Sequence, residues 1–205
     1  MILSVTKKFL FIHIPKTAGT SIRQVLEPFG VTEYFSYSKG IEKYIVARNK
    51  FPPHLSYVAA AEVLTVDLNR FYKFTFVRNP WDRYVSMYEY FRKDTKHAMH
   101  RRCMSCSFED FIDDVTAGRA TFDTKNQLDY IVRPARLGPI DFIGKVENIE
   151  TDFSIICRTI GIENTVLPVL NTTNHKNYES YYSDALKGKI ADFCKPEIEV
   201  FGYAF

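Results

Sequence analysis

The chain has 205 residues, of which 46% are hydrophobic and 25% charged, and its formal net charge is +3. This is ordinary globular composition, so a single domain over residues 1–205 is expected. The charge is too small to indicate binding to nucleic acid or to an anionic membrane. It is compatible with a local basic pocket for an anionic ligand.

The four cysteines are scattered and predict no disulfide framework, which favours a reducing compartment. Thr6, Lys7 and Lys8 lie where a signal peptide would need its apolar region. No apolar run approaches the roughly 20 residues of a membrane span. We therefore expect a cytoplasmic enzyme without a membrane span. The sequence carries no signal for an oligomeric state.

The first half of the chain twice shows a strand, a polar turn and a helix. Residues 9–14 are a short apolar run that predicts a buried strand, and the apolar spacing over 20–29 predicts a helix. A loop with a short helix at 56–64 follows. Residues 71–77 predict the second strand. Asn79 then serves as the N-cap, with Pro80 as the first residue, of a helix to about Lys93.

The second half adds further helices and one more strand. Residues 93–107 are basic, without periodicity, and are predicted to be an irregular insertion. Further helices are predicted over 108–115, 149–160 and 183–194, a third strand over 142–145 and a polar loop over 171–177. Alternating strands and helices predict an α/β sandwich with a mostly parallel sheet. Ligands of such sheets bind at the carboxyl ends of the strands, where both polar turns lie.

The first turn has the composition of an anion-binding loop. Pro15-Lys16-Thr17-Ala18-Gly19-Thr20-Ser21 joins the first strand to the first helix. Free N–H groups at a helix N-terminus bind anions, Gly19 allows close approach of a phosphate, and the hydroxyls and Lys16 add donors. The alternative is a capped turn with a solvated lysine. Because Lys16 precedes Gly19, the segment is not the GxxxxGK[ST] loop of nucleoside triphosphatases.

The second turn places Arg78 at the end of the second strand, where a guanidinium can bind phosphate oxygens in a bidentate manner. Ser86 lies less than two helical turns beyond Pro80, within reach of the same anion. In the alternative, Arg78 pairs with Asp82 and Ser86 is a surface residue. The two turns together predict a ligand with two separated anionic groups.

These residues resemble the sulfotransferases that use 3′-phosphoadenosine 5′-phosphosulfate (PAPS), of the type that includes carbohydrate 2-O-sulfotransferases and small bacterial relatives. The 5′-phosphosulfate loop of that family is similar to residues 15–21, and its 3′-phosphate segment to residues 78–83 with Ser86. Weaker similarity lies at residues 127–130, 144–148, 152–153, 167–173, 178–182 and 201–203. The resemblance implies a three-layer, P-loop-kinase-like fold, a 3′,5′-ADP product and no metal.

The resemblance also implies roles for individual residues. Lys16, Thr17, Gly19, Thr20 and Ser21 would hold the 5′-phosphosulfate, as would the backbone at Ala18, and Arg78 and Ser86 would hold the 3′-phosphate. The following residues complete the expected site: Thr173 and Lys176 covering the cofactor, and Gln127 and Tyr130 contacting the acceptor.

Transfer also requires a base for the acceptor hydroxyl, and histidine has a suitable pKa. His54 lies between the two anion-binding turns, where the resembling 2-O-sulfotransferases have their catalytic histidine, and we assign it as the base. The alternative is a surface histidine that caps a helix. His13 is expected to be a satisfied residue of the strand or its end.

A cluster of His97, His100, Cys103 and Cys106 contains residue types that bind zinc. Steps of three residues along one helix drift around its axis, so four such ligands would not converge, and no metal is expected. The basic residues of this insertion are Lys93, Lys96, Arg101 and Arg102. A solvated surface is their usual explanation, and if the acceptor is an acidic sugar, they would steer it. A small-molecule kinase and a non-catalytic nucleotide-binding protein remain as alternative functions.

Overall fold

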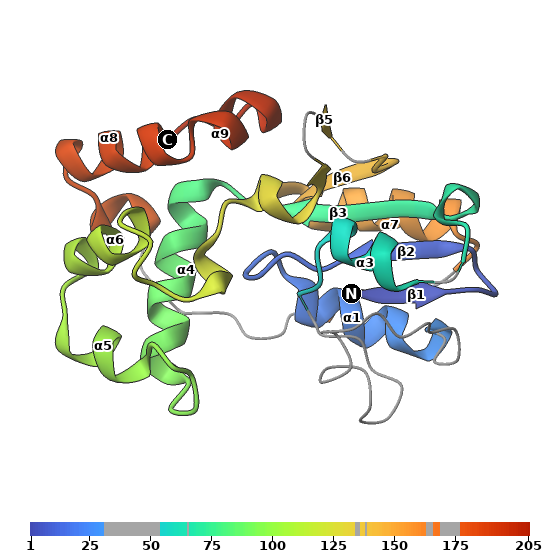
Figure 1. Cartoon of the computed structure of the whole chain (residues 1–205), viewed down its shortest axis with the longest axis horizontal. Helices are drawn as coiled ribbons and strands as arrows, with labels where there is room; N and C mark the ends of the chain where they lie inside the picture. Colours follow the sequence, from blue (N-terminus) through green and yellow to red (C-terminus); the bar gives the residue numbers. More distant parts are fainter. Residues whose placement is uncertain (31–53, 65, 134–135, 138, 163–165, 169–176) are drawn as a thin grey trace. The chain divides into compact units, whose positions relative to one another are not determined.

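A computed structural model describes residues 1–30, 54–64, 66–133, 136–137, 139–162, 166–168 and 177–205 (Figure 1). The chain forms two compact units. Unit 1 comprises Met1–Val77 and Gln127–Leu170, and unit 2 comprises Arg78–Asn126 and Asn171–Phe205. Each unit has a hydrophobic core of its own.

Unit 1 is built on a sheet of order β1-β2-β3-β6 (Figure 1). Its strands are β1 (Ile2–Ser4), β2 (Phe9–Ile12), β3 (Tyr72–Val77) and β6 (Phe142–Lys145). The strands β2, β3 and β6 are parallel, and β1 is antiparallel to β2. Because Ile12 pairs with Thr75, the carboxyl ends of β2 and β3 lie at the same edge of the sheet. The predicted mostly parallel sheet is confirmed.

Both faces of this sheet are buried. The rings of Phe9, Phe11, Phe74 and Phe76 form one core with residues of α1 (Gly19–Leu26) and α7 (Ile149–Thr159). Alternate residues, such as Leu10, Ile12 and Thr75, point to the opposite face and are fully buried too. Near-continuous apolar strands of this kind are typical of a parallel sheet covered on both sides. The α/β class is therefore confirmed.

Shorter elements complete unit 1. They are α3 (Tyr57–Val63), the strands β4 (Val132–Arg133) and β5 (Arg136–Leu137), and 3-10 helices at Glu27–Phe29, Leu68–Arg70, Gln127–Tyr130 and Val146–Asn148. Lys73 is a buried charge on β3. Its ammonium group lies 2.8 Å from the Asp141 carboxylate and donates to the Phe71 carbonyl at 2.6 Å. These partners offset the cost of removing the ammonium group from water.

Unit 2 is helical. Its α-helices are α4 (Pro80–Lys93), α5 (His100–Ser105), α6 (Phe108–Thr116), α8 (Asp184–Phe193) and α9 (Lys195–Phe201), with 3-10 helices at Phe122–Thr124 and Tyr178–Tyr181. Arg83 is fully buried and donates to the carbonyls of Asp123 (3.2 Å) and Lys125 (2.9 Å). It thereby fixes the segment that follows α6. The Phe205 ring packs against Trp81 and Tyr182.

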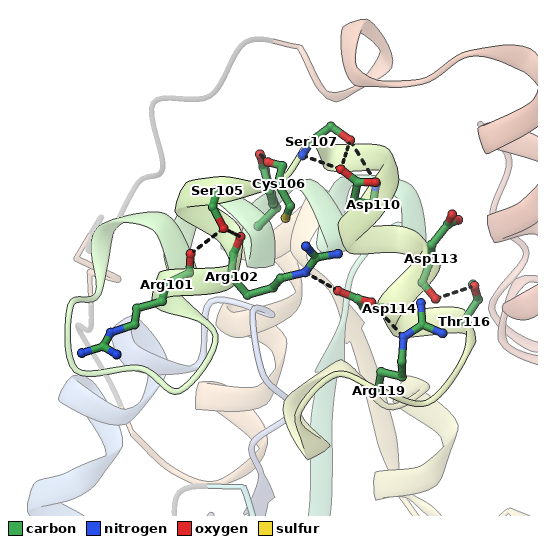
Figure 2. A network of polar contacts seen from close by, with 11 residues as sticks. Arg101, Arg102, Ser105, Cys106, Ser107, Asp110, Asp113, Asp114, Thr116 and Arg119 are labelled. Atoms are coloured by element: carbon green, nitrogen blue, oxygen red, sulfur yellow. Dashed lines mark hydrogen bonds and ion pairs between the residues drawn. The ribbon is translucent and has the colours of Figure 1, made fainter.

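A polar network joins α5 to α6 (Figure 2). Asp114 lies between two arginines and accepts from Nε of Arg102 at 2.7 Å and from Nε of Arg119 at 2.9 Å. The hydrogen bond from Arg102 is the largest cause of a lowered Asp114 pKa. Ser107 and Asp110 form a capping box at the start of α6. The network orders part of the segment that the sequence predicted to be irregular.

The structure differs from the predicted elements in several places. The insertion 93–107 contains α5, whose Cys103 is buried in the unit 2 core, so the prediction of an irregular segment was wrong there. The strand β1 is only three residues long and was not predicted. The helix α9, which begins at Lys195 with Pro196 in its first turn, was not predicted either.

Candidate functional site

The turn between β2 and α1 has an unusual backbone. Lys16 (φ 67°) and Ala18 (φ 58°) are both in the left-handed region, although neither is glycine. Such a conformation costs roughly 1–2 kcal/mol per non-glycine residue, and strained residues of this kind cluster at functional sites. Successive N–H groups in alternating right- and left-handed residues form a concavity that binds anions. The backbone geometry therefore supports an anion site in this turn.

The side chains of the turn stabilise this shape. The Thr17 hydroxyl is fully buried and donates to the Ile14 carbonyl at 2.9 Å, so its proton is used within the turn. Ala18 precedes α1, and no described side chain caps this helix or places an acidic group in its first turn. No described carboxylate in the first turn of α1 therefore neutralises the partial positive charge of its N-terminus. Thr20 is exposed and Ser21 is buried.

Gly19 is required here by close contact. A Cβ atom added to Gly19 would lie 1.8 Å from both Cδ2 and Nε2 of the His13 imidazole. That separation is far below any van der Waals contact, so a larger residue would displace the ring. The sequence assigned Gly19 to the close approach of a phosphate. The structure adds the His13 ring, which lies against the glycine.

His54 lies beside the same turn. Its Nδ1 is 3.1 Å from the His13 carbonyl oxygen. A carbonyl oxygen can only accept, so this hydrogen bond requires the proton on Nδ1 of His54, and the neutral ring then carries its lone pair on Nε2. The imidazole rings of His13 and His54 are 4.4 Å apart between centroids. The residue that caps α3 is Ser56, which accepts from the Ala59 N–H, so the structure does not support His54 as a helix cap.

His13 differs from His54 in its surroundings. It is 6% exposed, and its Nδ1 has no hydrogen-bond partner among the described residues, so the expectation of a satisfied histidine was wrong for that atom. Burial is the largest cause of a His13 pKa well below its ordinary value, and the charges of His54, Arg23 and Lys16 lower it further. His13 is therefore uncharged at neutral pH.

The residues of the second predicted turn lie in unit 2. Arg78 pairs with Asp82 through Nε at 2.7 Å, as one alternative anticipated, and both side chains are largely buried. Ser86 is 2% exposed, so it is not the surface residue of that alternative. Asn79 accepts from the Trp81 N–H, which confirms it as the N-cap of α4. The carboxylate of Asp82 thus fixes the orientation of the Arg78 guanidinium.

The residues assigned to acceptor binding are buried, Gln127 at 0% and Tyr130 at 4% exposure, in the 3-10 helix Gln127–Tyr130. The residues assigned to the cover of the cofactor, Thr173 and Lys176, lie outside the described residues. Roles for all four residues stay predictions.

The histidines of the basic segment have partners within unit 2. His97 accepts from the Met99 N–H through Nδ1, and its Nε2 lies 3.1 Å from an Asp123 carboxylate oxygen. His100 places Nδ1 3.0 Å from the Phe91 carbonyl. Among the described residues, no group of three or more His, Cys, Asp or Glu side chains is arranged to hold a metal ion. Among all the helices that the structure describes, none is both long enough and apolar enough to span a membrane.

Comparisons with known proteins point to one family. Residues 1–204 match the sulfotransferase family. An uncharacterised protein of Archaeoglobus fulgidus is 31% identical over 107 residues, which cover 51% of this chain and 80% of that protein. The fold is similar to a crystal structure of the mouse sulfotransferase SULT7A1 in complex with PAP. That similarity has a TM-score of 0.57 and 15% identity, and it covers 99% of this chain and 91% of the mouse chain.

Proposed function

We propose that this chain, which belongs to the sulfotransferase family, transfers a sulfuryl group from PAPS to a hydroxyl acceptor as a single domain. The observation that carries the proposal is the turn between β2 and α1. In this turn, Lys16 and Ala18 are left-handed, and the N-terminus of α1 has no described side-chain cap. Both features provide backbone N–H groups for an anion. The mouse sulfotransferase of similar fold is a complex with PAP, which supports the choice of nucleotide.

In this proposal, each end of the nucleotide has its own residues. Lys16, the backbone from Thr17 to Ser21 and the Thr20 and Ser21 hydroxyls hold the 5′-phosphosulfate. Arg78, oriented by Asp82, holds the 3′-phosphate together with Ser86. Thr173 and Lys176 are assigned by resemblance alone to the cover of the bound cofactor.

The transfer is an in-line displacement. The acceptor oxygen forms a bond to sulfur while the bond from sulfur to the 5′-phosphate oxygen breaks, and the hydroxyl proton passes to Nε2 of His54. The products are a sulfated acceptor and 3′,5′-ADP. Lys16 and the N-terminus of α1 stabilise the negative charge that develops on the departing phosphate, a form of electrostatic preorganisation. No residue of the described site is assigned to a metal.

Two observations favour His54 over His13 as the base. The hydrogen bond to the His13 carbonyl places the lone pair of the neutral His54 ring on Nε2, and the His54 side chain is only partly buried. His13 is buried, and its lowered pKa disfavours the protonated form. A base that must take up a proton during transfer is therefore better placed at His54.

The acceptor is proposed to be a carbohydrate hydroxyl, with Gln127 and Tyr130 contributing to its binding by resemblance. Lys93, Lys96, Arg101 and Arg102 are exposed in unit 2. Three of the four have no described ion pair, while Arg102 pairs with Asp114. These charges would attract an acidic sugar.

The direct test is a transfer assay with ³⁵S-labelled PAPS and a panel of acidic and neutral sugars, phenols and lipids. We expect labelled product with a sugar acceptor and no requirement for added magnesium. Labelled product only with a non-sugar acceptor would contradict the carbohydrate assignment alone. Tight binding of PAPS without transfer to any acceptor would instead indicate a non-catalytic nucleotide-binding protein.

A further inference from the structure

One side chain contacts both halves of the proposed reaction centre in unit 1. The edge of the His13 imidazole lies against Gly19, the first residue of α1 in the anion-binding turn. The same ring lies 4.4 Å from the His54 ring, between centroids. The donor turn and the base come from separate segments of the sequence, and the His13 ring lies close to both.

We propose that His13 is a positioning residue, whose buried imidazole is wedged between Gly19 and His54 and so fixes the base relative to the turn that holds the sulfuryl donor. This inference rests on the proposed function. It adds a role for a residue that takes no part in the chemistry itself.

The ring is held by packing more than by hydrogen bonds. Nδ1 of His13 is buried without a partner among the described residues, which is an unusual cost for a native structure. Its neighbour Phe11 stacks on it, with centroids 5.8 Å apart and planes 15° apart. Phe11 itself is fully buried in the core of unit 1. The core therefore fixes Phe11, Phe11 supports His13, and His13 supports both Gly19 and His54.

The main chain of His13 reinforces this arrangement, because its carbonyl accepts from Nδ1 of His54. The ring sets the position of His54, and the carbonyl sets its tautomer. A displacement of about 1 Å at a reacting group can reduce the rate about 10²-fold. Loss of the wedge should therefore lower kcat more than it alters the affinity for the nucleotide.

A double-mutant cycle with His13→Ala and Gly19→Ala tests the wedge without any ligand. Gly19 does not have a positive φ, so alanine fits its backbone and the new methyl group meets the His13 ring. Such overpacking should lower the melting temperature of Gly19→Ala by about 3–8 °C. In the His13→Ala background the same substitution should lower it by less than half as much. Equal losses in both backgrounds would overturn the wedge.

Transfer kinetics of His13→Ala test the positioning role. We expect kcat to fall by about 10–100-fold while KM for PAPS changes less than about threefold. The control is Leu10→Ala, which removes a fully buried side chain from the same strand and should leave kcat within about threefold. Equal kcat losses in both variants would reduce His13 to a structural residue. Absence of transfer by the wild-type chain would overturn the proposed function. The contact between His13 and Gly19 would still be tested by the double-mutant cycle, which needs no ligand.

Discussion

Replacement of His54 by alanine is expected to lower kcat by about 10²–10⁴-fold, because the acceptor hydroxyl then has no positioned base. Binding of 3′,5′-ADP should be nearly unchanged, since the anion-binding turn keeps its left-handed backbone and its Gly19–His13 contact. The measurements are a single-turnover transfer assay with labelled PAPS and a calorimetric titration with 3′,5′-ADP.

The matched control for this substitution is Ser56→Ala, in the same segment. It removes the side-chain cap of α3, a hydrogen bond of 3.3 Å to Ala59, and leaves the His54 ring in place. This variant should lose a little stability and keep its transfer rate. If His54→Ala retained wild-type kcat, the base would have to be another group, and the assignment of His54 would be refuted.

Replacement of Lys16 by methionine is expected to lower kcat by about 10²–10³-fold, the usual effect of removing one donor that stabilises developing charge. Methionine keeps most of the apolar length of the side chain and removes only the ammonium group. The affinity for 3′,5′-ADP should fall much less, because the backbone N–H groups of the turn remain. The measurement is kcat and KM for PAPS at saturating acceptor.

Lys8→Met is a close control for Lys16→Met. Lys8 is also a lysine in the left-handed region (φ 54°), but it is exposed and precedes β2 instead of following it. Both substitutions place methionine at a left-handed position, so any backbone cost is shared. Similar kinetic losses in the two variants would mean that backbone strain, and not the Lys16 charge, accounts for the effect.

Much of unit 1 could be predicted because its strands are nearly continuous apolar runs between polar turns. The strand at 142–145 was predicted at its observed bounds, and the helix α7 lies within the predicted 149–160. Gly161, with φ 66°, lies just beyond the end of that helix. The turn over residues 15–21 was identified as a candidate anion site because lysine, hydroxyl and glycine residues are contiguous there, and that role stays a prediction. The parallel register of β2 and β3 then places the two strand ends at one edge.

Contacts between residues distant in sequence could not be predicted. Nothing in the pattern around His13 indicates that its ring lies against Gly19, or that its carbonyl accepts from His54 forty-one positions later. The short helix α5 has no clear apolar periodicity, because Cys103 is its one buried residue. Tertiary packing of Cys103 can stabilise a helix that the local sequence does not predict. The ion pair between Arg78 and Asp82 was only one of two alternatives. From the sequence alone, an arginine that pairs with a carboxylate in the next helix turn looks the same as an arginine that binds a phosphate.

The expected ligand is a nucleotide with phosphates at both its 3′ and 5′ positions, and calorimetric titration distinguishes it from the ligands of a kinase. We expect 3′,5′-ADP to bind at least about tenfold more tightly than ADP or ATP without magnesium, a difference of about 1.4 kcal/mol. We also expect Arg78→Ala to remove most of this preference. Equal or tighter binding of ATP, dependent on magnesium, would refute this ligand and favour a small-molecule kinase.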